Sequence, residues 1–298
     1  MKYINKSSYI NLDNASVACM KWNLQIAIVA RPDWFIKEYD CKRVIIETPV
    51  GIHTHCFLGH WKDCAFLIIY GRFERIKRTS TDINFELTQS VINMLGIKRV
   101  IGTFVVGTIK KNASAGDVYL PDEMIGFGGY NQSLNKEKGF RNIDMFSPMC
   151  KQLHSILVNS SSKVNFKVIP KGTYVCFHHF PRIETKTELE FYERNSWDIV
   201  GQTLDPEATL ARESGCHYAC IAAAIDDVQI RTRLINNDPT SISEIEQYTI
   251  NGRKKTFDLF LNAIEDIIRI DDSQCSCTEQ GTNAKKPSKL FYYQPYFC

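Results

Sequence analysis

Short apolar runs rich in β-forming residues recur along this 298-residue chain, and helix-like patterns separate them. Several of the runs are apolar on both alternating faces, which is typical of strands that helices cover on each side. The pattern predicts strands at residues 24–30, 43–47, 65–70, 99–106, 164–169, 173–177 and 217–225. Strands that alternate with helices predict one α/β sheet, largely parallel, with ligand sites at the carboxyl ends of its strands.

Two apolar stripes with a helical repeat predict sheet-covering helices over residues 84–95 and 257–268. Helix starts are predicted at Ser147-Pro148 and Asp205-Pro206. Each pair places a capping side chain before a proline, whose missing N–H costs nothing in a first turn. The polar, glycine-containing stretch 126–139 is typical of a loop.

The chain is expected to have three parts. Residues 1–21 are interpreted as an N-terminal extension, residues 22–270 as a single domain, and residues 271–298 as a polar tail after the last helix.

Net charge, the length of the apolar stretches and cysteine usage narrow the classes of partner and the location that are expected. With 36 Lys and Arg against 33 Asp and Glu, the net charge is only +3, so a nucleic acid partner is not expected. The apolar stretches fall short of the roughly 20 residues that span a bilayer, and the opening residues lack the apolar core of a signal peptide. The eleven cysteines are an odd number without framework spacing, which favours reduced thiols and a cytoplasmic location.

Potential metal ligands stand close together at three places: Cys275-x-Cys277, His53-x-His55 and His178-His179. A zinc site needs further ligands at suitable spacing and a second shell, and neither is evident in the sequence. No metal and no cofactor are therefore expected.

Asp226 closes the apolar run of residues 217–225. A carboxyl group at the carboxyl end of a buried strand can lie at the mouth of a pocket and share a proton with a ligand nitrogen. The same residue could instead cap a following helix. The residues alone leave both roles open.

Five segments, spaced in the same order, carry a family resemblance: Gly71-Arg72-Phe73, Val105-Val106-Gly107-Thr108, Gly116-Asp117, residues 171–188 with Glu184-Thr185-Lys186-Thr187-Glu188, and Thr203-Leu204-Asp205-Pro206-Glu207. Together they resemble the trimeric purine nucleoside phosphorylases and the related 5'-methylthioadenosine phosphorylases. The similarity covers roughly residues 24–270. It implies a single-domain nucleoside phosphorylase-like α/β fold with a mixed, largely parallel sheet flanked by helices.

The resemblance implies cleavage of the N-glycosidic bond of a purine nucleoside, including a 5'-modified one such as 5'-methylthioadenosine, with phosphate as co-substrate and acceptor. The departing base gathers negative charge, so a donor at its N7 lowers the barrier. Asp226 matches the residue at N7 and would have to be protonated, which burial favours. Glu184 matches the glutamate at the other edge of the base. These two are the expected catalytic residues.

The remaining site residues follow from the same resemblance. Phosphate ligands are expected at three positions: Arg72, Thr203 and Arg31. Nucleoside contacts are expected at four: Gln202, Ile183, Val105 and Phe146. Phe146 resembles the aromatic residue that a neighbouring subunit lends to the sugar pocket, which implies a homotrimer.

The sequence departs from the family pattern mainly on the phosphate side. A glycine-rich phosphate turn is replaced by Ala30-Arg31-Pro32-Asp33, and proline has no N–H to offer. Glu74 stands where a histidine is expected, and Phe180 replaces a glycine of the base loop. Three hypotheses follow: phosphorolysis with altered phosphate contacts, hydrolysis with Glu74 or Asp33 acting on water, and a non-catalytic nucleoside-binding or interaction protein.

Overall fold

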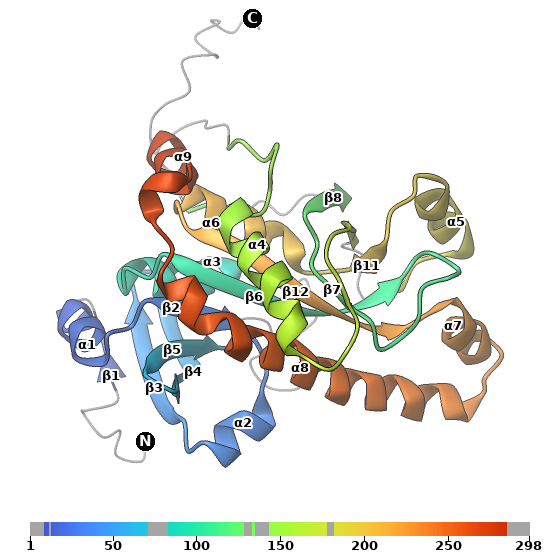
Figure 1. Ribbon diagram of the computed structural model, residues 1–298, viewed down its shortest axis with the longest axis horizontal. Helices are drawn as coiled ribbons and strands as arrows, with labels where there is room; N and C mark the ends of the chain where they lie inside the picture. The colour runs from blue at the N-terminus through green and yellow to red at the C-terminus, as the bar shows by residue number, and fades with distance from the viewer. Residues whose placement is uncertain are drawn as a thin grey trace, which may run out of the picture.

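The computed structural model describes residues 9–11, 13–70, 83–127, 133–134, 143–177 and 182–284. It confirms the predicted α/β fold, with a mixed and largely parallel sheet flanked by helices (Figure 1). The strands of the described residues are β1 (Tyr9–Ile10), β2 (Ile26–Val29), β3 (Lys42–Thr48), β4 (Gly51–Trp61), β5 (Cys64–Ile69), β6 (Arg99–Thr108), β7 (Val118–Tyr119), β8 (Glu123–Phe127), β9 (Val168–Ile169), β10 (Thr173–Phe177), β11 (Ile199–Gly201) and β12 (His217–Asp226).

The helices in the same residues are α1 (Ala15–Trp22), α2 (Asp33–Glu38), α3 (Phe85–Met94), α4 (Lys151–Ser160), α5 (Lys186–Arg194), α6 (Leu204–Glu213), α7 (Val228–Ile235), α8 (Pro239–Ile268) and α9 (Cys277–Ala284), with the short 3-10 turns η4 (Ser161–Lys163) and η5 (Asp272–Gln274). None of these described helices has the length and apolar character needed to cross a membrane.

The sheet is built outward from β6. Its strands run in the order β1-β3-β4-β5-β2-β6-β11-β10-β8, and β12 lies beside β6, β7 beside β12 and β9 beside β7. One edge of β6 pairs with β12. On the other edge, parallel β2 ends with Val29 opposite Gly102, and antiparallel β11 has Val200 opposite Gly107. The segments after β2 and β11 therefore approach each other along residues 103–106 of β6.

Alternation along the central strands sorts the core into two layers. In β2, Ile26 and Ile28 pack with α4 and α8 on one face of the sheet, whereas Ala27 and Val29 pack with α3 and α6 on the other. Figure 1 shows α4 and α8 side by side along their face. Burial on both faces explains why these strands are apolar throughout.

The structure corrects several details of the predicted elements. Within the predicted strand 164–169 only residues 168–169 form β9, whereas β8 runs into the expected loop through Gly126 and Phe127. Helix α4 begins at Lys151 and not at Ser147-Pro148, because the Cys150 N–H bonds to the carbonyl of Tyr218 in β12 and Cys150 itself has an extended backbone. The start predicted at Asp205-Pro206 is confirmed by α6.

The segment expected to be a tail after the last helix contains two further helical elements. The turn η5 and helix α9 lie within residues 271–298, and Figure 1 shows α9 beside α6. The polar composition of this segment hid a helix that packs through few residues, Cys277 among them.

Candidate active site

Asp226 ends β12 at a β-bulge. Ala224 lies opposite Val106 of β6 while Asp226 lies opposite Gly107, so β12 has an extra residue in this step of the ladder. Such a bulge bends a strand and re-aims its side chains. A Cβ placed on Gly107 would come within 2.8 Å of Oδ1 of Asp226, so the glycine lets the carboxyl group lie against β6.

The neighbouring residue, Asp227, caps helix α7. Its Oδ1 accepts hydrogen bonds from the N–H groups of Gln229 at 2.9 Å and Ile230 at 3.0 Å, and Oδ2 accepts one from Ala115 at 3.2 Å. The capping role that the sequence left open for Asp226 thus belongs to Asp227. The side chain of Asp226 is left at the pocket end of the strand.

Arg231 of α7 is the charged partner of Asp226. Its Nη1 lies 2.5 Å from Oδ1 of Asp226, and its Nη2 donates to the carbonyl oxygen of Thr108. The side chain is almost fully buried, and its Nε has no hydrogen-bond partner among the described residues. The guanidinium group is therefore fixed in place while one buried donor remains available.

Two carboxyl groups share the environment of this guanidinium. Burial raises the pKa of Asp226 to about 6, with the Arg231 charge opposing the rise and the Glu184 carboxyl group adding to it. Burial also raises the pKa of Glu184, again against the charge of Arg231. The Glu184 carboxyl group therefore lies near enough to raise the pKa of Asp226, and the charge of Arg231 acts on both carboxyl groups.

Glu184 is positioned by the start of helix α5. The hydroxyl group of Thr185 accepts from the N–H of Glu188 at 3.2 Å, and the Glu188 carboxylate accepts from the N–H of Thr185 at 2.7 Å, which forms a capping box. Arg182 donates two hydrogen bonds to Glu188, at 2.8 and 2.9 Å, and holds the pKa of that carboxyl at about 2. Glu188 is thus structural, and it fixes the residue before the helix.

A cavity of about 570 Å³ opens between α5 and α7. Glu184 and Arg231 both line it, together with apolar side chains such as Ile109 and Leu189. Ile183, an expected nucleoside contact, also lines it and is 54% exposed. Asp226 does not line this cavity: of the two expected carboxyl groups only Glu184 does, and Asp226 is paired with Arg231, which also lines it.

The expected phosphate ligands stand at the gap along β6. Arg31 follows β2 and Thr203 follows β11, the two strands whose ends approach each other beside residues 103–106. The Thr103 hydroxyl group donates to the carbonyl oxygen of Val29 at 3.0 Å and braces the end of β2 there. The third expected ligand, Arg72, lies outside the described residues, as do Glu74 and Phe180.

Asp33, which the hydrolysis hypothesis has acting on water, is already paired. Its Oδ2 lies 3.2 Å from Nε of Arg31, and its Oδ1 accepts from the Tyr70 hydroxyl group at 2.5 Å. Arg253 of α8 faces the same group, since burial and the charge of Arg31 lower its pKa while Asp33 and Tyr70 raise it. Two guanidinium groups therefore stand near one carboxylate, which leaves this end of the site positive.

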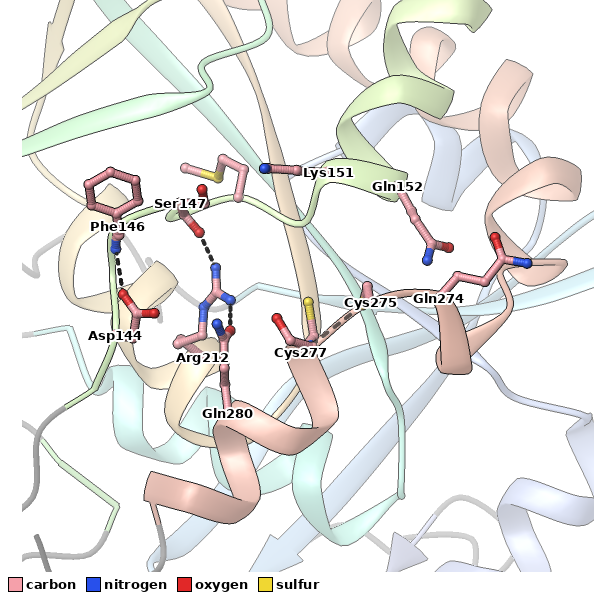
Figure 2. A pocket seen from close by; sticks show the side chains of 12 residues that line it. Asp144, Phe146, Ser147, Lys151, Gln152, Arg212, Gln274, Cys275, Cys277 and Gln280 are labelled. Carbon is pink, nitrogen blue, oxygen red and sulfur yellow. Dashed lines mark hydrogen bonds between the residues drawn. The ribbon is translucent and has the colours of Figure 1, made fainter. Parts of the chain in front are cut away.

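The other three expected nucleoside contacts lie at two different places in the fold. Val105 lies on β6 opposite Ala223, and Gln202 follows β11 at the gap, so both adjoin the phosphate end. Phe146 is 90% exposed and lines a different cavity, beside α9 (Figure 2). It does not line the cavity of Glu184 in its own chain.

Sequence reasoning missed two arginines and one structural role. Arg231 lies on α7, which was not predicted, and Arg253 lies on α8 ahead of the predicted stripe at residues 257–268; neither belongs to a motif that would mark it as functional. The capping role of Glu188 had a signal, because Thr185-x-x-Glu188 is the capping-box pattern.

Comparisons with known proteins give the geometry a context. The sequence model of the phosphorylase superfamily matches residues 81–265. A probable S-methyl-5'-thioinosine phosphorylase of Thermodesulfovibrio yellowstonii is 32% identical over 205 residues, 68% of this chain and 77% of that protein. The S-methyl-5'-thioadenosine phosphorylase of Nitrosopumilus maritimus is 30% identical over 247 residues, 80% of this chain and 89% of that protein.

Solved structures agree at the level of the fold. A variant of the adenosine/methylthioadenosine phosphorylase of Schistosoma mansoni superposes with a TM-score of 0.73, at 18% identity, over 88% of this chain and 97% of that one.

Proposed function

Because the chain belongs to the phosphorylase superfamily, we propose that it cleaves the N-glycosidic bond of purine nucleosides with inorganic phosphate as the acceptor. The relatives named above are phosphorylases of 5'-methylthio nucleosides, and this chain matches most of their length. The observation that carries the proposal is the grouping of Asp226, Glu184 and Arg231 at the carboxyl end of β12.

The base end of this group suits a leaving purine. As the bond to the sugar breaks, its electron pair passes to the base, and N7 becomes a stronger proton acceptor. Protonated Asp226 donates its proton to N7, and the carboxylate that forms on Asp226 is stabilised by the adjacent guanidinium of Arg231. Glu184 lines the cavity, where its carboxyl group can bind an N–H of the base. A group with a pKa near 6 is well placed for proton transfer near neutral pH.

The opposite end suits phosphate. The attacking phosphate oxygen forms a bond to the cation-like anomeric carbon while the base leaves from the other side. Arg31 and Thr203 stand at the gap along β6, and Arg253 supplies a second guanidinium beside Arg31. Charge-assisted hydrogen bonds from these groups would replace those of the missing glycine-rich turn.

Assembly and location belong to the same proposal. The exposure of Phe146, which lies away from its own nucleoside cavity, fits an aromatic residue that completes a neighbour's sugar pocket in a homotrimer. All ten cysteines in the described ranges are unpaired as thiols, which fits a reducing cytoplasm.

The test follows release of free base from inosine, adenosine and 5'-methylthioadenosine, each with and without phosphate. We expect release only with phosphate, accompanied by an equal amount of the sugar 1-phosphate. Release without phosphate would identify a hydrolase, although Asp33 is engaged by Arg31 and Tyr70 and is poorly placed to activate water. No release, together with a nucleoside-induced rise in melting temperature, would identify a binding protein.

The matched control is Asp226→Ala. It should abolish turnover while the circular dichroism spectrum stays that of the wild type. Undiminished turnover would remove Asp226 from the mechanism.

A further inference from the structure

Four potential metal ligands from distant parts of the chain converge at the base of α9: Cys150, His217, Cys275 and Cys277. Their ligand atoms all lie within 4.8 Å of one another. Nδ1 of His217 is 3.4 Å from Sγ of Cys150 and 3.2 Å from Sγ of Cys275. The partners that Cys275-x-Cys277 lacked in the sequence are thus supplied by the fold.

We propose that one structural zinc ion is bound by these four side chains. Three thiolates and one imidazole form a ligand set that zinc takes in closed tetrahedral sites. With Zn–S bonds of about 2.3 Å and Zn–N bonds of about 2.0 Å, a tetrahedron places its sulfurs about 3.8 Å apart and its sulfur and nitrogen about 3.5 Å apart. The two sulfur–nitrogen separations, 3.4 and 3.2 Å, match that size, and no two of the four ligand atoms are more than 4.8 Å apart.

The imidazole presents Nδ1 to two of the sulfurs and has a carboxylate near Nε2. His217 is fully buried, and while its Nδ1 faces the sulfurs, its Nε2 lies 3.1 Å from Oδ1 of Asp272. Arg99 holds that carboxylate at 2.8 Å and also donates to the carbonyl oxygen of Ile270 at 2.8 Å. A carboxylate on the far nitrogen of a metal-binding histidine fixes its tautomer and strengthens it as a ligand.

The ligands come from elements that the ion would join. Cys150 immediately precedes α4, His217 begins β12, and Cys275 and Cys277 flank the start of α9. Cys150 and Cys277 are buried, and Cys277 is the first residue of a short polar helix. Bound zinc would fasten α9 to the sheet, a contribution that its sparse apolar packing does not provide.

The same fastening reaches the loop of Phe146. Figure 2 shows the guanidinium group of Arg212 bridging Gln280 of α9 and the carbonyl oxygen of Ser147. Phe146 precedes this serine, and Cys150 ends the loop. Zinc on Cys150 and Cys277 would therefore hold both sides of the Arg212 bridge and order the exposed aromatic residue.

The experiment measures zinc in the full chain, produced without a polyhistidine tag and purified in a reducing, chelator-free buffer. Inductively coupled plasma mass spectrometry should find about one zinc per chain. Cys275→Ser and Cys277→Ser should each lower this to below about a tenth. The control Cys41→Ser, which changes a half-buried cysteine outside the cluster, should keep the wild-type content.

Two further readouts keep the test decisive if a variant folds poorly. Cobalt(II) exchanged into the wild type should show thiolate-to-cobalt charge-transfer absorption and intense tetrahedral visible bands. Removing zinc should lower the melting temperature by more than about 5 °C in the wild type and leave that of Cys277→Ser unchanged.

The proposal is overturned if reduced wild-type protein neither contains zinc nor takes it up on dialysis. It is also overturned if Cys275→Ser and Cys277→Ser retain wild-type zinc, or if intact mass shows these cysteines joined as a disulfide in freshly purified protein. None of these measurements depends on the nucleoside chemistry.

Discussion

Nη1 of Arg231 lies 2.5 Å from Oδ1 of Asp226, and both atoms occupy the space that a Cβ on Gly107 would need. This pairing lowers the pKa of Asp226 against the rise that burial causes. Replacing Arg231 by methionine keeps the length of the side chain and removes the charge. The fall of kcat/KM with rising pH reports the titration of Asp226, and we expect its midpoint to move up by about one pH unit. We also expect kcat to fall, because the carboxylate that forms on Asp226 during turnover loses its counterion. An unchanged midpoint would show that Arg231 does not act through Asp226.

Asp226 itself should impose a pH limit. Its pKa is raised to about 6, so the acid form that donates to the base predominates below that pH and is lost above it. We expect kcat/KM to fall about tenfold per unit as the pH rises beyond about 6. Asp226→Asn carries a permanent donor and should flatten this fall. The ratio of kcat/KM of the variant to kcat/KM of the wild type, taken at each pH, cancels the effect of phosphate titration. A ratio independent of pH would contradict the role of Asp226 as the proton donor.

Gly107 sets the space in which the pair forms. A Cβ at this position would lie 2.6 Å from Nη1 of Arg231 and 2.8 Å from Oδ1 of Asp226. Gly107→Ala should therefore displace both side chains and reduce kcat/KM by about a hundredfold. The fold should persist, since the atoms that must move are side-chain ends. The measurement is steady-state kinetics beside a thermal melt; wild-type kinetics would show that the pair tolerates displacement.

The capping box of α5 makes a prediction about stability. The hydrogen bonds from Arg182 depress the pKa of Glu188 from 4.5 to about 2, so the ionised group stabilises the fold above about pH 4.5, and this contribution is lost as the pH falls toward 2. Glu188→Gln should cost about 0.5–1 kcal/mol at pH 7, or about 2 °C in melting temperature. The loss should shrink below about pH 4.5. Glu190→Gln on the same helix, whose carboxylate is 3.7 Å from Lys186, is the control and should have little effect.

Much of the scaffold could be predicted because buried parallel strands are apolar on both faces and stand out in the sequence. Asp226 and Glu184 could be predicted as site residues because Asp226 ends such a strand and Glu184 lies in a segment that resembles a family motif. Of the cysteine cluster only Cys275-x-Cys277 stood out; Arg231, Cys150 and His217 did not, since their meaning lies in contacts between segments distant in sequence. Composition also hid α9, whose residues are polar and whose anchoring comes from side chains elsewhere in the fold.

The last prediction concerns phosphate. Arg253 of α8 is half-buried, and burial and the charge of Arg31 lower its pKa while Asp33 and Tyr70 raise it, so it lies in the electrostatic environment of these groups. Arg253→Ala should raise the KM for phosphate by about tenfold or more, because a charge-assisted hydrogen bond contributes about 1.5–3 kcal/mol. The KM for nucleoside should change little, since the base is held at the other end of the site. Lys254→Ala removes an exposed charge at the next position and should leave both constants at wild-type values. Equal changes in the two KM values would instead mean that Arg253 supports the site as a whole and does not bind phosphate.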